Sequence, residues 1–335
     1  MEYRRLGKSD LDISVLTLGA WQYGDERCWG KIAEKNIYEV IAKAVNSGIN
    51  IIDTAIGYGD SEIIVGKAIK NFREKVIIVS KCGADPKRIL QRVNLSLKRM
   101  ELDYIDLYLV HYPDVDIPIE DTIEAMAMIR DKGKVRYVGV SNFSVNQLKR
   151  ALSVTDITCC ESAYNLMWRE IEDRGILDFC YKNNIGVLTY SSLGQGLFTG
   201  KIRKIDDIPK GGIREATLLF KGDAFKKGLD IVNILDRLSE KYNKTPAQIA
   251  INWIINRKGV SSAIAGIVNM EELTENLGAI GWKMEKEDYE FLNSIGFQFS
   301  KIFDYVSYTM FGDKLNEIKF DKELDNLLKR GGQKC

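Results

Sequence analysis

The dominant pattern along the chain is an alternation of short apolar runs with longer stretches whose apolar residues recur at helical spacing. Apolar runs of this length, bounded by glycine or polar residues, predict buried strands. We expect eight strands, at residues 15–18, 49–53, 76–81, 105–110, 135–140, 157–160, 186–190 and 262–265. A short hairpin is expected before them, at residues 3–13.

Amphipathic stretches between these strands predict helices at residues 33–47, 61–71, 86–100, 119–131, 176–182, 225–242, 246–256 and 270–278. Local signals support several of the boundaries. Gly48 can close the first helix, Pro86 suits a first helical turn, and Ser144 can cap a further helix after the fifth strand. Strands that alternate with helices in this way indicate parallel pairing with right-handed crossovers.

Eight β-strand and α-helix units without an evident linker favour one closed α/β TIM barrel, (β/α)₈, over an open sheet. An open doubly wound sheet usually carries G-x-G-x-x-G after its first strand, whereas residues 18–24 read LGAWQYG. We expect the barrel to occupy residues 1–298, with an N-terminal hairpin. Residues 299–335 are expected to form a C-terminal extension, helix-compatible over 314–329.

Composition narrows the function classes. Lys and Arg number 48 against 47 Asp and Glu, so neither nucleic acid nor a membrane surface is indicated as a partner. No apolar run approaches the ~20 residues that span a bilayer, and the first residues lack a signal-peptide segment. Six scattered cysteines and one histidine argue against a metal site and for reduced thiols in a cytoplasmic protein. The oligomeric state is not indicated.

Four chemistry-bearing side chains lie at or just after consecutive strand ends. Asp53 ends the second expected strand, Lys81 the third, and His111 follows the fourth. Tyr58 lies in a glycine-rich turn after Asp53. Singly, such residues are more often a helix cap, a solvated lysine or a core histidine. In a barrel, however, the carboxyl ends of the strands form one face, which predicts a shared site.

These four residue types suit proton transfer to a carbonyl oxygen. A tyrosine has an ordinary pKa near ~10, which is high for a proton carrier at neutral pH. A nearby lysine ammonium favours the phenolate, and an aspartate holds that lysine charged. His111 can orient and polarise a carbonyl beside the Tyr58 hydroxyl.

The constellation resembles the aldo-keto reductase family over about Tyr3 to Ile295. The matching segments, in order, are LGAWQYG from Leu18, DTAIGYGDSE from Asp53, VSKCG from Val79, LYLVHYPD from Leu107, VRYVGVSNFS from Val135, YNL from Tyr164, TYSSLGQGLFTGK from Thr189 and ENLGA from Glu275. The resemblance implies a (β/α)₈ barrel and hydride transfer between NAD(P)(H) and a carbonyl or alcohol.

Carried over position by position, the resemblance implies that Tyr58 is the general acid in reduction, tuned by Lys81 and Asp53, and that His111 orients the carbonyl. It implies a nicotinamide site and substrate mouth formed by Ala20, Trp21, Asp53, Ser141, Asn142, Glu161 and Tyr190. The pyrophosphate and adenosine would pass along Ser191, Leu193, Gly194, Gly196, Gly266, Val268, Glu272, Glu275 and Asn276. For Tyr190 and Trp21, core packing is the alternative.

The chain departs from the family pattern at Glu161, where glutamine is usual. A carboxylate there can accept a hydrogen bond from the carboxamide but cannot donate one. It also interacts favourably with an oxidised, cationic nicotinamide. We therefore predict a bias toward the oxidised cofactor.

Two further departures concern the cofactor phosphate and the tail. NADP-using relatives commonly carry cationic or hydroxyl groups near Val268 and arginine at the position of Glu272, and a carboxylate makes a poor phosphate clamp. We expect NAD to serve at least as well as NADP, unless cations from residues 201–214 compensate. The tail carries Phe299, Phe303, Tyr305, Tyr308 and Phe311. These aromatics either line the substrate pocket or belong to a helix that packs under the barrel or at a subunit contact.

We therefore expect an oxidoreductase that acts on a small aldehyde, ketone or sugar. Two alternatives remain: a regulatory subunit that senses redox state through a bound nicotinamide, and an enzyme that retains its cofactor for internal-redox epimerisation or elimination. The identity of the substrate and the physiological direction are not indicated by the sequence.

Overall fold

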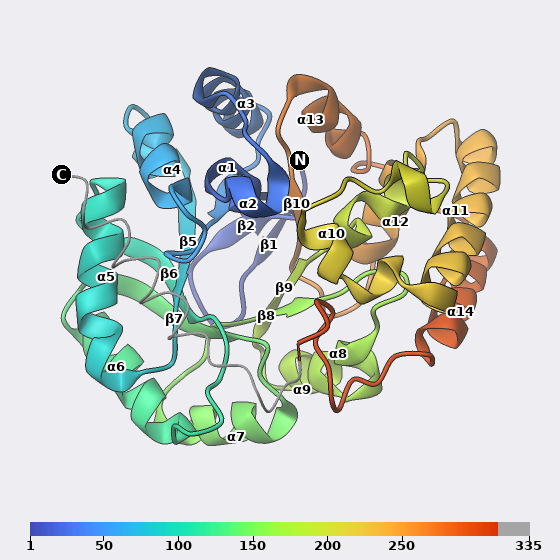
Figure 1. Cartoon of the computed structure of the whole chain (residues 1–335). Coiled ribbons are helices and arrows are strands. Elements are labelled where there is room, and N and C mark those ends of the chain that lie inside the picture. Colours follow the sequence, from blue (N-terminus) through green and yellow to red (C-terminus); the bar gives the residue numbers. More distant parts are fainter. Residues whose placement is uncertain (314–335) are drawn as a thin grey trace.

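The computed structural model describes residues 1–313, in which eight parallel strands close into a barrel (Figure 1). The strand order around the barrel is β10-β3-β4-β5-β6-β7-β8-β9. The bounds are β3 (Leu16–Gly19), β4 (Ile51–Asp53), β5 (Ile77–Cys82), β6 (Ile105–Val110), β7 (Val135–Ser141), β8 (Cys159–Ala163), β9 (Gly186–Tyr190) and β10 (Ser262–Gly266). The predicted (β/α)₈ barrel is confirmed.

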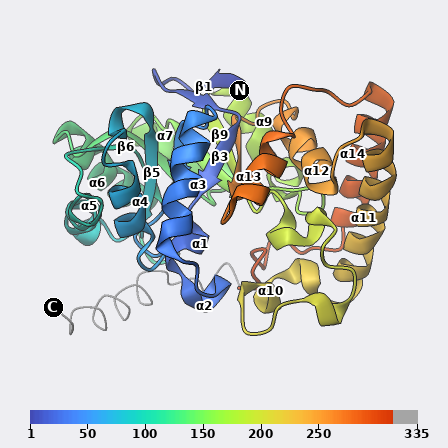
Figure 2. The ribbon, with the colours of Figure 1, turned by 90° about the horizontal axis from the view of Figure 1, so that it is seen from above.

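The expected N-terminal hairpin is also present, as antiparallel β1 (Tyr3–Arg5) and β2 (Asp12–Ser14). Figure 2 shows it at one end of the barrel, with the short helices α2 (Glu26–Trp29) and α10 (Ile213–Ala216) at the other. Three buried side chains from the hairpin region, Leu6, Leu11 and Ile13, belong to the same apolar cluster as the barrel interior. The hairpin therefore plugs the amino-terminal end of the strands.

Helices surround the barrel in Figure 1. They are α3 (Glu34–Asn46), α4 (Ser61–Ile69), α5 (Pro86–Met100), α6 (Ile119–Asp131), α7 (Val145–Val154), α9 (Ile176–Lys182), α11 (Gly222–Tyr242), α12 (Pro246–Ile255), α13 (Met270–Leu277) and α14 (Lys286–Ser300). Shorter helical pieces lie in the loops: α1 (Trp21–Gly24), α8 (Glu170–Asp173), η1 (Arg73–Lys75), η2 (Gly194–Thr199), η3 (Ile205–Asp207) and η4 (Leu218–Phe220). No helix within residues 1–313 is long and apolar enough to cross a membrane.

Local sequence explains where several helices begin. The Asp85 side chain accepts a hydrogen bond from the Lys87 amide at 3.0 Å, immediately before Pro86. Ser144, predicted as an N-cap, forms a reciprocal capping box with Gln147. Each device satisfies amide groups that the first helical turn leaves without an intrahelical partner.

Helix α14 was not predicted from the sequence. It includes residue 298, where the barrel was expected to end. Its buried positions are Leu292, Gly296 and Ser300, whereas Phe291 and Phe297 are exposed. The apolar residues therefore do not mark one face, so the helical period is hidden. The helix expected at residues 314–329 lies outside the described residues.

Candidate active site

The side chains of the site follow from the two-residue period of the strands. One apolar layer inside the barrel contains Ile51, Val79, Leu109, Cys159 and Leu188. Residues two positions further along a strand point to the same side. The next layer toward the carboxyl ends therefore consists of Asp53, Lys81, His111, Glu161 and Tyr190. The same strand geometry that buries the apolar layer brings five polar groups together.

A cavity of about 1320 Å³ opens above this layer. It exceeds the ~300–1,000 Å³ of pockets for drug-sized ligands, which leaves room for a long ligand and a second small molecule. Asp53, Tyr58, His111, Glu161 and Tyr190 all line it. Lys81 is fully buried beneath them.

Lys81 is held by the carboxylate of Asp53, with its Nζ 2.6 Å from both oxygens and 3.1 Å from the Thr54 carbonyl. Burial opposes the ammonium, but Asp53 and Glu161 outweigh it and raise the pKa of Lys81 above its usual value. The ammonium lies 5.1 Å from the centre of the Tyr58 ring. The predicted lysine–aspartate pair therefore lies directly under the phenol.

Tyr58 and His111 face each other at the cavity floor, with 3.4 Å between the hydroxyl and Nε2. Burial and the Lys81 charge hold the pKa of His111 well below its usual value, so its ring is neutral at neutral pH. Burial raises the pKa of Tyr58; Lys81 lowers it, as expected, but does not outweigh burial and the carboxylates. In this environment Tyr58 is a protonated hydroxyl that can donate.

The turn that carries Tyr58 is fixed by close backbone contact with the loop after β3. Gly59 has a φ of +56°, and a Cβ there would lie 2.0 Å from the Gly24 carbonyl oxygen. A Cβ on Gly24 would lie 2.3 Å from the Tyr58 carbonyl oxygen. This approach stacks Trp21 on Tyr58, with ring centres 5.5 Å apart.

Glu161 lies beside the same lysine, with its Oε1 3.3 Å from Lys81 Nζ. Its side chain is 2% exposed, and its Oε2 has no hydrogen-bond partner among the described residues. Burial and Asp53 raise the pKa of Glu161 well above its usual range, against the effect of Lys81. Glu161, the residue that departs from the family pattern, thus contacts Lys81 of the predicted tetrad.

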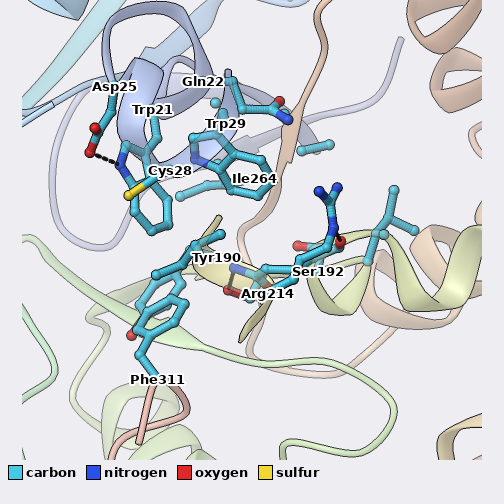
Figure 3. Close-up of a pocket in the computed structure, with 18 of the residues that line it drawn as sticks. Trp21, Gln22, Asp25, Cys28, Trp29, Tyr190, Ser192, Arg214, Ile264 and Phe311 are labelled. Carbon is cyan, nitrogen blue, oxygen red and sulfur yellow. Dashed lines mark hydrogen bonds between the residues drawn. The ribbon is translucent and has the colours of Figure 1, made fainter. Parts of the chain in front are cut away.

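Neighbouring polar groups connect the floor of the cavity to Tyr190. The Tyr190 hydroxyl donates to Asn142 Oδ1 at 2.8 Å, and Asn142 Nδ2 donates to the His111 carbonyl at 3.0 Å. Ser141 Oγ accepts from the same amide at 2.9 Å. The Phe311 ring lies 8° from parallel to Tyr190, with the ring centres 6.4 Å apart (Figure 3).

The loop after β9 winds tightly through left-handed backbone conformations at Ser191, Gly194, Gln195 and Gly196. Such concave loops commonly hold phosphate groups. Arg214 donates to the Gln195 carbonyl at 2.7 Å, and its guanidinium lies 5.2 Å from the centre of a Trp29 ring. Figure 3 shows Arg214 among the residues that line the cavity. The Arg214 guanidinium therefore lies beside a loop whose backbone can bind an anion.

At the β10 end of the cavity, Glu272 turns its carboxylate toward the backbone. Its Oε2 accepts a hydrogen bond from the Val268 amide at 2.9 Å. Glu275 and Asn276 from the same helix, and Gly266 before it, line the cavity. The Glu272 carboxylate thus accepts the hydrogen bond of the Val268 amide, which an anionic ligand could otherwise accept.

Most of the predicted site residues line the cavity, and a few lie behind it. Those outside its lining are Ala20, Lys81, Ser141, Asn142, Gly194 and Val268. The sequence pattern did not single out several further lining residues, among them Gln22, Asp25, Tyr112 and Gln195. Two of these had a positional signal: Tyr112 follows His111 directly, and Gln195 lies between two predicted glycines.

The aromatic residues of the tail have two kinds of surroundings. Tyr308 and Phe311 line the cavity. Phe303 and Tyr305 instead pack on Trp168, with ring centres 5.0 and 4.9 Å away. Residues 299–313 therefore both line the cavity and pack on the loop after β8.

Comparison with known proteins agrees with this geometry. The Aldo/keto reductase family model matches residues 15–296. The chain is 37% identical over 311 residues to the aldo-keto reductase YhdN of Bacillus subtilis, covering 88% of this chain and 93% of that protein. It is 30% identical over 311 residues to an NADH-specific methylglyoxal reductase of Escherichia coli, covering 84% and 94%.

Two solved structures are also similar. The glycerol dehydrogenase AKR11B4 from Gluconobacter oxydans matches with a TM-score of 0.81 and 29% identity, covering 92% of this chain and 99% of that one. The thermostable aldo-keto reductase Tm1743, solved with the inhibitor epalrestat, matches with a TM-score of 0.74 and 32% identity, covering 88% and 100%. With the family model spanning most of the chain and these relatives matched along nearly their whole length, the chain belongs to the aldo/keto reductase family.

Proposed function

We propose that the protein transfers a hydride between NAD(P)(H) and a small carbonyl compound or its alcohol, with an aldehyde, ketone or sugar as substrate. The observation that carries this proposal is the pair of groups at the cavity floor. The Tyr58 hydroxyl and His111 Nε2 are 3.4 Å apart, above a lysine ion-paired to Asp53. A carbonyl oxygen seated between them can accept hydrogen bonds from both.

The residues of the cavity fit a nicotinamide dinucleotide. Tyr190 offers an aromatic face, and Arg214, Lys201 and Arg27 supply positive charge along the wall. The buried Oε1 of Gln195, like Glu161 Oε2, lacks a hydrogen-bond partner among the described residues, so the site contains acceptors that a ligand can satisfy. When bound, the cofactor supplies or accepts the hydride.

In the reducing direction, Tyr58 donates its proton to the carbonyl oxygen as negative charge develops there. Lys81 stabilises the resulting phenolate, since the ammonium is already fixed by Asp53 and needs no rearrangement. Neutral His111 donates through Nε2 and orients the carbonyl. In the oxidising direction the Tyr58 phenolate takes the proton back from the alcohol.

The cofactor preference follows from Glu272. Its carboxylate lies on the Val268 amide, at the point where the family pattern leads us to expect the 2′-phosphate of NADP. A like charge there disfavours the phosphate, whereas a ribose hydroxyl can donate to it. The similar protein from Escherichia coli is described as NADH-specific. We therefore propose that NAD is used at least as well as NADP.

Steady-state kinetics with a panel of aldehydes, ketones and sugars, each with NADH and NADPH, tests this function. We expect turnover with several small carbonyls and a kcat/KM for NADH equal to or above that for NADPH. A strong NADPH preference would overturn the cofactor assignment. A cofactor that co-purifies and never exchanges during turnover would instead support internal-redox epimerisation or elimination.

A further inference from the structure

The buried charges around Lys81 do not balance. Lys81 Nζ contacts both oxygens of Asp53 at 2.6 Å and the Oε1 of Glu161 at 3.3 Å. One ammonium can neutralise one carboxylate, so two ionised carboxylates would leave one excess negative charge below the cavity. Asp53 makes the shorter contacts and retains the lysine, which leaves Glu161 as the uncompensated group.

Within residues 1–313, Lys81 is the one cation that acts on Glu161. The titratable groups that face it are Asp53 on β4, Lys81 on β5, Cys159 on its own strand, Tyr190 on β9, and Tyr58, Tyr112 and His111 from the loops. All of these except Lys81 are neutral or anionic at neutral pH. Burial, the charge of Asp53 and a hydrogen bond with the Asp53 carboxylate raise the pKa of Glu161 against the effect of Lys81, which fits a carboxyl that keeps its proton until a cation approaches.

The position of Glu161 lets a ligand supply that cation. The residue lines the cavity next to Tyr190, and its Oε2 is buried without a partner among the described residues. The oxidised nicotinamide ring is positively charged and the reduced ring is neutral. The glutamine usual in the family can hydrogen-bond either form, but it cannot change its charge between them.

Building on the proposed function, we infer that Glu161 is a proton-linked selector of cofactor redox state, carboxylate beside NAD⁺ and carboxylic acid beside NADH. The proton leaves the Glu161 carboxyl for solvent when the cationic form binds, and it returns when the neutral form replaces it. No electrons move in this step. Glu161 thereby favours binding of the oxidised cofactor increasingly as the pH rises.

Calorimetric titration of NAD⁺ and NADH tests this inference without relying on turnover. For the unaltered protein between about pH 6 and about pH 9, we expect NAD⁺ affinity to rise with pH by up to about tenfold per unit, with a proton released on binding. NADH affinity should not rise in this way. Repeating the NAD⁺ titration in buffers of different ionisation enthalpy counts the released proton directly.

The isosteric variant Glu161→Gln removes the titrating group. Its NAD⁺ affinity should lose the pH dependence and the proton release. Its preference for NAD⁺ over NADH at about pH 8 should fall about tenfold, equivalent to ~1.4 kcal/mol.

Glu62→Gln is the matched control, because Glu62 is equally buried, accepts from Ser80 at 2.7 Å and does not line the cavity. It should keep the unaltered profile. The inference is overturned if NAD⁺ affinity is independent of pH in the unaltered protein, or if Glu161→Gln keeps the original preference. Binding of neither cofactor would overturn the proposed function as well, whereas normal binding and turnover with an unchanged preference would overturn only the role of Glu161.

Discussion

The two ends of the barrel handle buried charge in opposite ways. At the hairpin end, Asp106 is bound by Arg73 at 2.6 Å, by Arg136 at 3.2 Å and by the Ile78 amide at 2.9 Å. At the cavity end, Lys81 is shared by two carboxylates, and one oxygen of Glu161 has no partner among the described residues. The Asp106 carboxylate at the hairpin end is therefore electrostatically satisfied, whereas Glu161 at the cavity end is not.

This difference agrees with a general property of such barrels. Residues at the carboxyl ends of the strands form the active site, whereas residues at the amino ends contribute mainly to stability. A satisfied cluster gains nothing from a ligand. A cluster with an unsatisfied buried group binds more tightly a ligand that supplies the missing hydrogen bond or charge. Substitutions at the two ends should therefore separate activity from stability.

The largest expected effect is that of Tyr58→Phe. Loss of the donated proton should lower kcat/KM for carbonyl reduction by about 10³–10⁴-fold, the upper range for general acid catalysis. Stability measured by thermal unfolding should barely change, because the hydroxyl makes one long contact, to His111. Tyr112→Phe, which removes another hydroxyl lining the cavity, should cost less than about tenfold. Unchanged reduction by Tyr58→Phe would refute the mechanism.

Next in size is Lys81→Met, measured by denaturant unfolding. It leaves the ionised Asp53 buried beside Glu161 without a cation, and breaking such a pair should cost ~3–5 kcal/mol of unfolding free energy along with activity. Arg73→Met at the hairpin end leaves Asp106 bound to Arg136 and a backbone amide, so the cost should be ~1–2 kcal/mol with kcat/KM unchanged. Equal costs for the two variants would contradict the proposed difference between the two ends of the barrel.

A smaller effect is expected for Glu272→Arg. The substitution replaces a repelling carboxylate by a cation where we expect the 2′-phosphate, so kcat/KM with NADPH should rise about tenfold relative to NADH. Glu271→Arg makes the same charge change one residue away, at an exposed position outside the cavity lining. If both variants shift the ratio equally, a general field effect and not a specific contact determines the preference.

The smallest effect concerns the stability of Glu161→Gln. A carboxyl whose pKa is raised by folding binds more protons when folded, so its ionisation destabilises the fold as pH rises above the unfolded pKa of about 4.3. The variant should therefore gain on the unaltered protein by ~1 kcal/mol between about pH 5 and about pH 6. Asp106→Asn, which breaks satisfied ion pairs, should be destabilising instead. A stability difference for Glu161→Gln that stays constant over this range would contradict the prediction.

Much of the fold was predictable because its signals are local. Apolar runs of four to six residues, helix caps such as Ser144, and Pro86 at a first turn each act within a few residues. Helix α14 escaped because its exposed Phe291 and Phe297 hide the helical period. The positions of the tail aromatics could not be predicted for another reason. Tyr305 packs on Trp168 and Phe311 on Tyr190, so their surroundings depend on distant parts of the chain.

The sequence by itself determined the barrel and the convergence of Asp53, Lys81 and His111, since alternation along each strand and parallel pairing bring strand ends to one face. Only the tertiary structure decided which of these groups touch. Lys81 on β5 meets Glu161 on β8 across the barrel interior, between strands that are not neighbours in the sheet. Such contacts depend on how the whole barrel closes, which no local pattern encodes.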